Sequence, residues 1–260
     1  MTSGNRERNA MDRHAQPGRS AVTTRIGCLG DSLTRAQFSV DYLDLLERRR
    51  PPGDVQLARF GINGDFAYNL LQRLDAVVTD PPEVITVLIG TNDARSSLAG
   101  YPVEQAMKRK RLPQRPSAGW FQHCLGAVVA RLRTETDATI GLLSLPVLGQ
   151  QLDGAAAQAS QAYSRMIAEV AAANEVAYLP LHERQTEELR QADPPPIPYL
   201  EVRSEATVGV LVQHAVLRRS LDSISRRRGL VLTTDHVHQN SRGAAVIAEV
   251  IDAGLLPQGA

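Results

Sequence analysis

Short apolar runs alternate with amphipathic stretches along most of this chain. Runs rich in β-branched and other apolar residues have the length of buried strands, and they lie at 24–29, 55–60, 84–89, 139–145 and 176–179. Between them, apolar residues recur at helical spacing and predict helices at 38–50, 67–78, 121–133 and 155–173. This alternation is typical of a mostly parallel sheet with helices on both faces, and it predicts a three-layer α/β/α fold.

Two segments depart from the alternation. The polar, basic and proline-containing stretch 95–117 predicts a long loop with a short helix in it. Segment 181–234 contains the stiff, extended piece 193–198, which is rich in proline, and then helical periodicity over 206–228. We interpret 181–234 either as an insertion that helps to form a substrate pocket or as an ordinary peripheral helix pair.

The charge balance of the 260-residue chain gives no general reason to expect a nucleic-acid partner. There are 29 basic and 28 acidic residues, and aromatic residues make up 4% of the chain, too few for a base-stacking platform. Basic runs occur at 48–50, 108–111 and 226–228. We interpret them mainly as solvated helix faces or ends, with contact to an anionic substrate or a partner surface as the alternative.

The N-terminal residues and the hydropathy of the chain predict its compartment. Residues 1–20 are polar and charged without an apolar core, so neither a signal peptide nor a membrane anchor is expected. No apolar stretch has transmembrane length. We therefore expect a cytoplasmic protein with no membrane partner, a disordered arm over 1–22 and a single domain over 23–260.

Neither cofactor nor metal is expected. Cys28 and Cys124 are too few for a disulfide framework and lack metal-ligand spacing, and Cys28 in the first apolar run predicts a buried side chain. The histidines outside 235–238 are scattered, and the chain has neither a phosphate-binding glycine loop nor a dinucleotide fingerprint.

Four polar blocks follow the predicted strands or precede the last amphipathic stretch. They are Gly30-Asp31-Ser32-Leu33-Thr34, Gly61-Ile62-Asn63-Gly64-Asp65, Gly90-Thr91-Asn92-Asp93 and Asp235-His236-Val237-His238. The carboxyl ends of parallel strands meet at one edge of a sheet, so the first three blocks are expected to converge there.

The blocks contain the groups that ester hydrolysis through an acyl-enzyme requires. Ser32 is the candidate nucleophile, and His238 is the candidate base that later protonates the leaving alcohol. Asp235 can accept a hydrogen bond from the other imidazole nitrogen of His238 and fix its tautomer. His236 is a competing base, but a spacing of three residues from Asp235 favours His238.

The same blocks supply candidate donors for an oxyanion. These are the backbone N–H groups of Ser32 and Gly64 and the side-chain amide of Asn92. Asp31 and Asp93, which lie beside Ser32 and Asn92, are expected to hold their loops by accepting backbone hydrogen bonds. Each block alone is typical of a turn or a helix cap, whereas all four in this order are specific.

Together the four blocks resemble those of the GDSL or SGNH hydrolase family of esterases and lipases. The family takes its name from a serine, a glycine, an asparagine and a histidine in separate blocks, which correspond here to Ser32, Gly64, Asn92 and His238. The resemblance extends over most of residues 23–256. It implies the SGNH hydrolase fold with a flavodoxin-like sheet, Asp235 as the partner of His238, and an oxyanion hole formed by Ser32, Gly64 and Asn92.

The function expected from these blocks is hydrolysis of a carboxylic ester through an acyl-enzyme. We expect a small-molecule ester as substrate, with a short acyl or O-acetyl group favoured. An acyltransferase, a thioesterase or a lysophospholipase would use the same residues, and an acyltransferase would differ in excluding water from the acyl-enzyme. A catalytically idle binding module on the same fold is the rival of a different class. The sequence predicts no oligomeric state.

Overall fold

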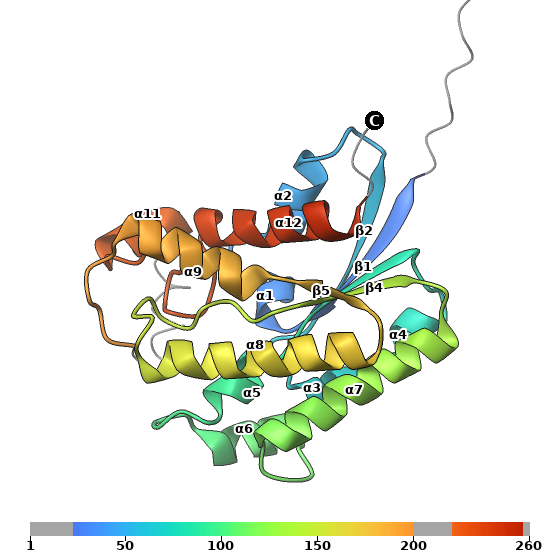
Figure 1. Ribbon diagram of the computed structural model, residues 1–260, viewed down its shortest axis with the longest axis horizontal. Helices are drawn as coiled ribbons and strands as arrows, with labels where there is room; N and C mark the ends of the chain where they lie inside the picture. The colour runs from blue at the N-terminus through green and yellow to red at the C-terminus, as the bar shows by residue number, and fades with distance from the viewer. Residues whose placement is uncertain (1–22, 200–219, 257–260) are drawn as a thin grey trace, which may run out of the picture.

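A fully parallel, five-stranded sheet forms the middle layer of the protein (Figure 1), described by a computed structural model at residues 23–199 and 220–256. The strands are β1 (Thr24–Gly30), β2 (Val55–Gly61), β3 (Val84–Leu88), β4 (Thr139–Leu143) and β5 (Ala177–Leu179). Their order across the sheet is β2-β1-β3-β4-β5, and every neighbouring pair is parallel. This is the flavodoxin-like order, so the predicted fold class is confirmed.

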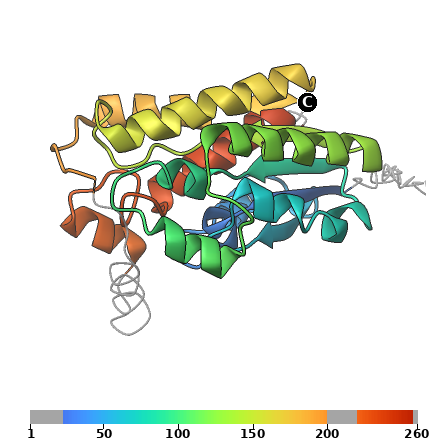
Figure 2. The same cartoon turned by 90° about the horizontal axis from the view of Figure 1, so that it is seen from below.

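Helices cover both faces of this sheet. They are α1 (Ser32–Arg35), α2 (Tyr42–Arg48), α3 (Ala67–Leu71), α4 (Asp75–Val78), α5 (Thr91–Arg95), α6 (Val103–Lys110), α7 (Ala118–Glu135), α8 (Ala155–Ala173), α9 (Leu181–Ala192), α11 (Leu221–Arg227) and α12 (Ser241–Leu255). In Figure 1, α2 and α12 lie above the sheet, whereas α3, α7 and α8 lie below it. Figure 2, seen from below, shows α7 and α8 running side by side across that face.

Two apolar clusters hold the three layers together. One contains Ile85, Val87 and Leu142 from the sheet and packs against α3, α7 and α8. The other lies on the opposite face, where Ile26 and Leu88 contact α2 and α12. All residues of β3 are buried, because a parallel strand covered on both faces has no solvent side. This explains why β3 is uncharged and rich in β-branched residues, with Thr86 as its one polar residue.

The strands β1, β2 and β3 end in register at the edge that carries the polar turns singled out in the sequence. Gly30, the last residue of β1, lies beside Gly61 of β2 and Leu88 of β3. A Cβ on Gly61 would lie 2.4 Å from the backbone nitrogen of Arg35, so only glycine lets the first turn of α1 approach β2 this closely. The loops after β1, β2 and β3 therefore leave the sheet side by side.

Most of the predicted elements are present, and two predicted helices differ. The helix expected at 67–78 is divided into α3 and α4, because hydrogen bonds of the shorter i to i−3 kind, such as Arg73 N to Leu70 O at 3.1 Å, interrupt it. The helix expected at 38–50 begins only at Tyr42, where the Asp41 carboxylate accepts from the Leu43 N–H and caps it.

The segment 181–234 contains a helix that the sequence reading did not predict. Residues 181–192 form α9, whose buried residues include Gln185 and Leu189. Of the helix expected at 206–228, the part that is described is α11; most of the remainder and the arm expected at 1–22 lie outside the described residues. The extent of a single domain over 23–260 stays a prediction.

The two cysteines of the chain are both free and buried. Burial raises the pKa of Cys28 and that of Cys124 to about 11 each. Cys28 is thus the small buried apolar residue that the sequence predicts. No helix in the described part of the chain combines the length and the apolar character needed to cross a membrane.

Candidate active site

The turn between β1 and α1 presents Ser32 at the edge of the sheet. Asp31 is the N-cap of α1, and its Oδ1 accepts a hydrogen bond of 3.0 Å from the Leu33 N–H. Ser32 is the first helical residue and is 8% exposed. Its N–H belongs to the first turn of the helix, where backbone donors have no partner within the helix and point outward. The local sequence therefore places the Ser32 hydroxyl and the Ser32 backbone N–H together at the start of α1.

The loop before α12 positions the second half of the site through its own hydrogen bonds. The Oδ1 atom of Asp235 accepts from the His238 N–H at 2.8 Å and from the Val237 N–H at 3.2 Å. The loop is closed by a bond of 2.8 Å from Thr234 N to His238 O. His236 has a φ of +72°, the left-handed conformation that such a tight turn requires.

These two loops bring Ser32, His238 and Asp235 into one chain of hydrogen-bond contacts. The distance from Ser32 Oγ to His238 Nε2 is 3.1 Å, and that from His238 Nδ1 to Asp235 Oδ2 is 2.8 Å. Burial opposes ionisation of Asp235, but the imidazole and backbone N–H groups of His238 outweigh it, so the pKa of Asp235 is lowered. An ionised Asp235 holds the imidazole with Nε2 free to accept the serine proton.

His236 does not reach Ser32. Its side chain is 8% exposed and lies edge-on to the ring of Tyr199, with the ring centroids 5.7 Å apart. Burial lowers the pKa of His236. Among the described residues its Nδ1 has no hydrogen-bond partner, while its backbone oxygen accepts from Gly149 N at 2.9 Å. His236 is therefore a buried wall residue and not an exposed one.

Asn92 lies in the first turn of α5, next to the serine turn. Its Nδ2 donates to the backbone oxygen of Asp65 at 3.0 Å and to Oδ2 of Asp31 at 3.3 Å, and its Oδ1 accepts from Arg95 at 3.3 Å. The side-chain amide is thus held from both ends. Its two donor contacts link the loops that follow β1, β2 and β3.

Gly64 occupies the turn after β2 with a φ of +74°, which strains any residue other than glycine. A Cβ at this position would also lie 3.1 Å from Cε of Lys110. Both constraints favour glycine at position 64, where the backbone of the turn carries no side chain.

Arg73 supports this edge from beneath and was missed in the sequence. Its guanidinium donates to the backbone oxygens of Gly30 at 2.8 Å and Phe60 at 2.9 Å, and to the Asp65 carboxylate at 2.8 Å. It therefore ties the end of β1 to the end of β2. The sequence holds no signal for this role, because an arginine in the predicted helix 67–78 is typical of a solvated face.

Phe38 was also missed as a neighbour of the site. The sequence places it on the apolar face of a helix, whereas the structure places it before α2, against His238, with the ring centroids 5.3 Å apart. The helix begins later than predicted, at the Asp41 cap, so Phe38 is free to turn toward the imidazole instead of the core. It forms a wall of the site.

Asp31 and Asp93 accept backbone hydrogen bonds, as the sequence predicts for them. Asp93 Oδ2 accepts from the Ala67 N–H at 3.1 Å and so joins α5 to the start of α3. Burial raises the pKa of Asp31 to about 6 and that of Asp93 to about 7. Both carboxyl groups are enclosed by the loops that they connect.

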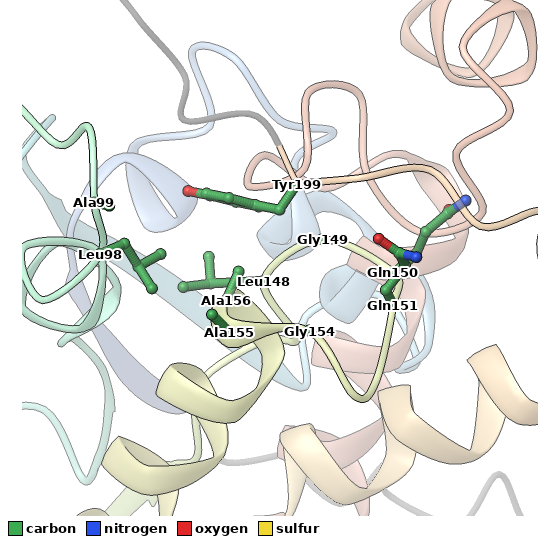
Figure 3. Close-up of a pocket in the computed structure, with 10 residues that line it drawn as sticks. All are labelled: Leu98, Ala99, Leu148, Gly149, Gln150, Gln151, Gly154, Ala155, Ala156 and Tyr199. Carbon is green, nitrogen blue, oxygen red and sulfur yellow. The ribbon is translucent and has the colours of Figure 1, made fainter.

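A cavity of about 290 Å³ opens beside the histidine loop (Figure 3). Leu98 and Leu148 point toward each other across it, and Tyr199 extends over them. Tyr199 also packs against His236 and covers Gly149, where a Cβ would lie 3.3 Å from its ring. The remaining lining residues are Ala99, Gln150, Gln151, Gly154, Ala155 and Ala156. The cavity is thus mainly apolar, and its lining residue Tyr199 packs against His236 of the histidine loop.

The side chains brought together at this site have the chemistry of acyl transfer. A hydroxyl, an imidazole and a carboxylate at hydrogen-bond distance can generate an oxygen nucleophile. Across residues 23–199 and 220–256, no three His, Cys, Asp or Glu side chains are grouped so that they could hold a metal ion.

Solved structures with this fold include an esterase and a second hydrolase. Axe2, an acetylxylan esterase from Geobacillus stearothermophilus, aligns with a TM-score of 0.61 at 16% identity and covers 88% of this chain and 93% of its own. LAE5, an α/β hydrolase from the metagenome of Lake Arreo, Spain, aligns with a TM-score of 0.61 at 17% identity and covers 90% of this chain and 95% of its own. At these identities the likeness shows a shared fold. No curated protein matches the chain.

The sequence itself matches a family model over most of its length. The matching model describes the GDSL-like Lipase/Acylhydrolase family, and it covers residues 28–201. This range includes the blocks around Ser32, Gly64 and Asn92. The resemblance found in the sequence is confirmed, and the chain belongs to the GDSL-like lipase/acylhydrolase family of carboxylic ester hydrolases.

Proposed function

We propose that this protein is a serine esterase that hydrolyses small esters with a short acyl or O-acetyl group through an acyl-enzyme. The observation that carries the proposal is the unbroken contact from Ser32 Oγ through the His238 ring to Asp235, with distances of 3.1 and 2.8 Å. A serine that only capped a helix would need neither the imidazole nor the carboxylate behind it.

In the first half of the reaction, His238 acts as base and then as acid. Its Nε2 takes the proton of Ser32 as Oγ attacks the carbonyl carbon, and Asp235 stabilises the resulting imidazolium. The tetrahedral intermediate then collapses, the bond to the alcohol oxygen breaks, and His238 returns the proton to the leaving alcohol. The product of this half is an ester between the acyl group and Ser32.

The negative charge that develops on the carbonyl oxygen is stabilised by three donors. We assign this role to the N–H groups of Ser32 and Gly64 and to Nδ2 of Asn92. Of the two donor contacts that Asn92 makes, that with the Asp31 carboxylate is the longer, at 3.3 Å, and is the one that an oxyanion would replace. The other contact keeps the amide in place during the exchange.

In the second half of the reaction, water is the nucleophile and Ser32 is the leaving group. His238 takes a proton from a water molecule, which attacks the acyl carbon, and the bond between that carbon and Ser32 Oγ breaks. The proton passes from His238 to the serine oxygen, and the carboxylic acid leaves. An acyltransferase would substitute another alcohol for water at this step.

The cavity under Tyr199, whose ring packs against His236, is small, and a short acyl group or a small alcohol fits its size. Its volume of about 290 Å³ is just under the range of roughly 300–1,000 Å³ that is typical of small-molecule pockets. The shared fold with Axe2, an acetylxylan esterase, agrees with this preference. Among the similar structures are catalytic mutants of Axe2 in which an aspartate, a histidine or a serine is replaced by alanine.

The decisive experiment compares the wild-type protein with Ser32→Ala on p-nitrophenyl esters from acetate to palmitate. We expect turnover to be greatest at acetate and to fall by about four to six orders of magnitude in Ser32→Ala, because the residual rate comes only from binding and the oxyanion donors. Ser97→Ala is the matched control, since that hydroxyl bonds only locally, to Ala94 O at 2.6 Å.

Labelling by a fluorophosphonate provides the second readout. The wild-type protein and Ser97→Ala should be labelled, and Ser32→Ala should not, while thermal unfolding shows that all three are folded. If the protein is labelled but hydrolyses none of the esters, the serine is reactive but water does not attack the acyl-enzyme. That result would favour an acyltransferase, in which another acyl acceptor takes the place of water. The absence of both would contradict the proposal and favour a binding module.

A further inference from the structure

The basic run 108–111, interpreted from sequence mainly as a solvated helix end, lies against the proposed oxyanion hole. It forms the C-terminal end of α6. A Cβ built on Gly64 would lie 3.3 Å from Nη2 of Arg109 and 3.1 Å from Cε of Lys110. The guanidinium of Arg109 therefore borders the glycine whose backbone we assign to the oxyanion. Cations are favoured near the C-terminus of any helix, but that preference does not explain this position.

The end of α6 is fixed in this position by contacts on either side of Arg109. Lys110 Nζ forms an ion pair of 2.7 Å with Asp65, the residue that follows Gly64. The backbone oxygen of Lys110 accepts from Asn69 Nδ2 at 2.9 Å. Because Lys110 is held by both its side chain and its backbone, the neighbouring Arg109 emerges from an anchored point.

Within the described part of the chain, the guanidinium of Arg109 forms no ion pair. Asp65, which follows Gly64, already pairs with Arg73 at 2.8 Å and with Lys110 at 2.7 Å. By contrast, Arg115 just beyond the helix pairs with Glu104 at 2.6 Å. Arg109 is exposed and has no carboxylate within ion-pair distance among residues 23–199 and 220–256.

We propose that Arg109 binds an anionic group of the substrate, so that the preferred esters carry a carboxylate or a similar anion near the scissile bond. This inference rests on the proposed esterase function and specifies its substrate class. Arginine suits this role because its planar guanidinium donates two parallel hydrogen bonds to a carboxylate. Nearby charge favours binding of an anionic ester over a neutral ester of the same shape.

The test compares matched esters that differ in charge. On the acyl side, mono(4-nitrophenyl) glutarate is compared with 4-nitrophenyl pentanoate; on the alcohol side, 4-acetoxybenzoate is compared with 4-acetoxybenzamide. For at least one pair, we expect Arg109→Gln to lower the anionic-to-neutral ratio of kcat/KM by about tenfold. Lys108→Gln, which removes an exposed charge from the same helix end, should leave the ratio unchanged. The pair that responds identifies the side of the substrate that carries the anion.

A binding measurement separates this inference from the proposed function. Ser32→Ala cannot cleave the esters, so calorimetry can measure its affinity for intact 4-acetoxybenzoate and mono(4-nitrophenyl) glutarate. Weaker binding of either one after adding Arg109→Gln supports the anion site even if no ester is hydrolysed. Equal affinities with and without Arg109, or an equal response to Lys108→Gln, would overturn the inference while leaving serine-dependent hydrolysis of neutral esters intact.

Discussion

The serine turn and the histidine loop hold the two halves of the site by different means. Ser32 stands at the end of a central strand, where the register of β1 with β2 and β3 and the Asp31 cap set its position. His238 follows no strand of the sheet. Its loop is shaped by the Asp235 carboxylate, the left-handed His236 and one closing bond to Thr234.

This difference shows which half of the site depends on the fold and which on local chemistry. The position of the serine turn depends on the sheet edge and on Gly61, whose lack of a side chain lets α1 approach β2. In the histidine loop, the carboxylate that orients the imidazole also shapes the backbone, since the same Asp235 serves the ring at 2.8 Å and the His238 N–H at 2.8 Å. The proposed catalytic role of Asp235 is therefore coupled to the conformation of the histidine loop.

The largest effect that tests this comparison is expected from the two histidines of that loop. His238→Ala should lower kcat by about four orders of magnitude or more, because no other described base contacts Ser32. His236→Ala should cost less than about tenfold, since its ring packs on Tyr199 and not on the serine. Steady-state kinetics of both variants on p-nitrophenyl acetate measure the contrast, and the reverse ranking would refute the choice of base.

A smaller effect is expected from Asn92, which joins the serine turn to the neighbouring loops. Asn92→Ala should lower kcat by about two to three orders of magnitude, because an oxyanion donor acts mainly in the transition state. KM should change little. A higher KM with an unchanged kcat would instead assign Asn92 to substrate binding or to support of the loops through the backbone oxygen of Asp65.

The smallest effect concerns stability and the buried Asp93. Its pKa is raised from 3.8 to about 7 in the folded protein, mainly by burial. Between about pH 4 and 7 the unfolded chain has lost this proton and the folded protein retains it, so this residue makes the free energy of unfolding fall as pH rises through that window. Above pH 7 the contribution levels off.

Asp93→Asn removes this titration and keeps an oxygen that can accept from the Ala67 N–H. The free energy of unfolding of Asp93→Asn minus that of the wild type should therefore increase by about 1–3 kcal/mol from pH 4 to pH 8. Urea unfolding at several pH values measures it. A pH-independent difference would show that Asp93 is ionised in the folded protein throughout.

Much of the fold is readable from sequence because its strands are defined by burial. Val84–Leu88 is uncharged and almost wholly apolar because both its faces are covered, and the order of strands and helices then constrains the topology. The positions of Ser32, Asn92 and the Asp235–His238 pair follow from short blocks at strand or helix ends. These signals are local, so a few neighbouring residues are enough to reveal them.

What the sequence reading missed depends on contacts between distant residues. The helix predicted at 67–78 is divided near Arg73. The side chain of Arg73 bonds Gly30 and Phe60, which lie 43 and 13 residues earlier in the chain. The sequence predicts a core position for Phe38 from its apolar character alone. In the structure its ring contacts His238, which lies 200 residues later in the chain. In α9 the buried face includes Gln185, which bonds Gln239, so its hydrophobic pattern is weak.

The buried cysteines give the protein a practical property. A thiol reacts as its thiolate, and a pKa of about 11 leaves almost none at neutral pH for Cys28, four residues before the proposed nucleophile, or for Cys124. Maleimides and other thiol reagents should therefore leave the folded wild-type chain unmodified. It already provides a background for single-site labelling, in which a fluorophore or spin label attached to one introduced surface cysteine would report on that position alone.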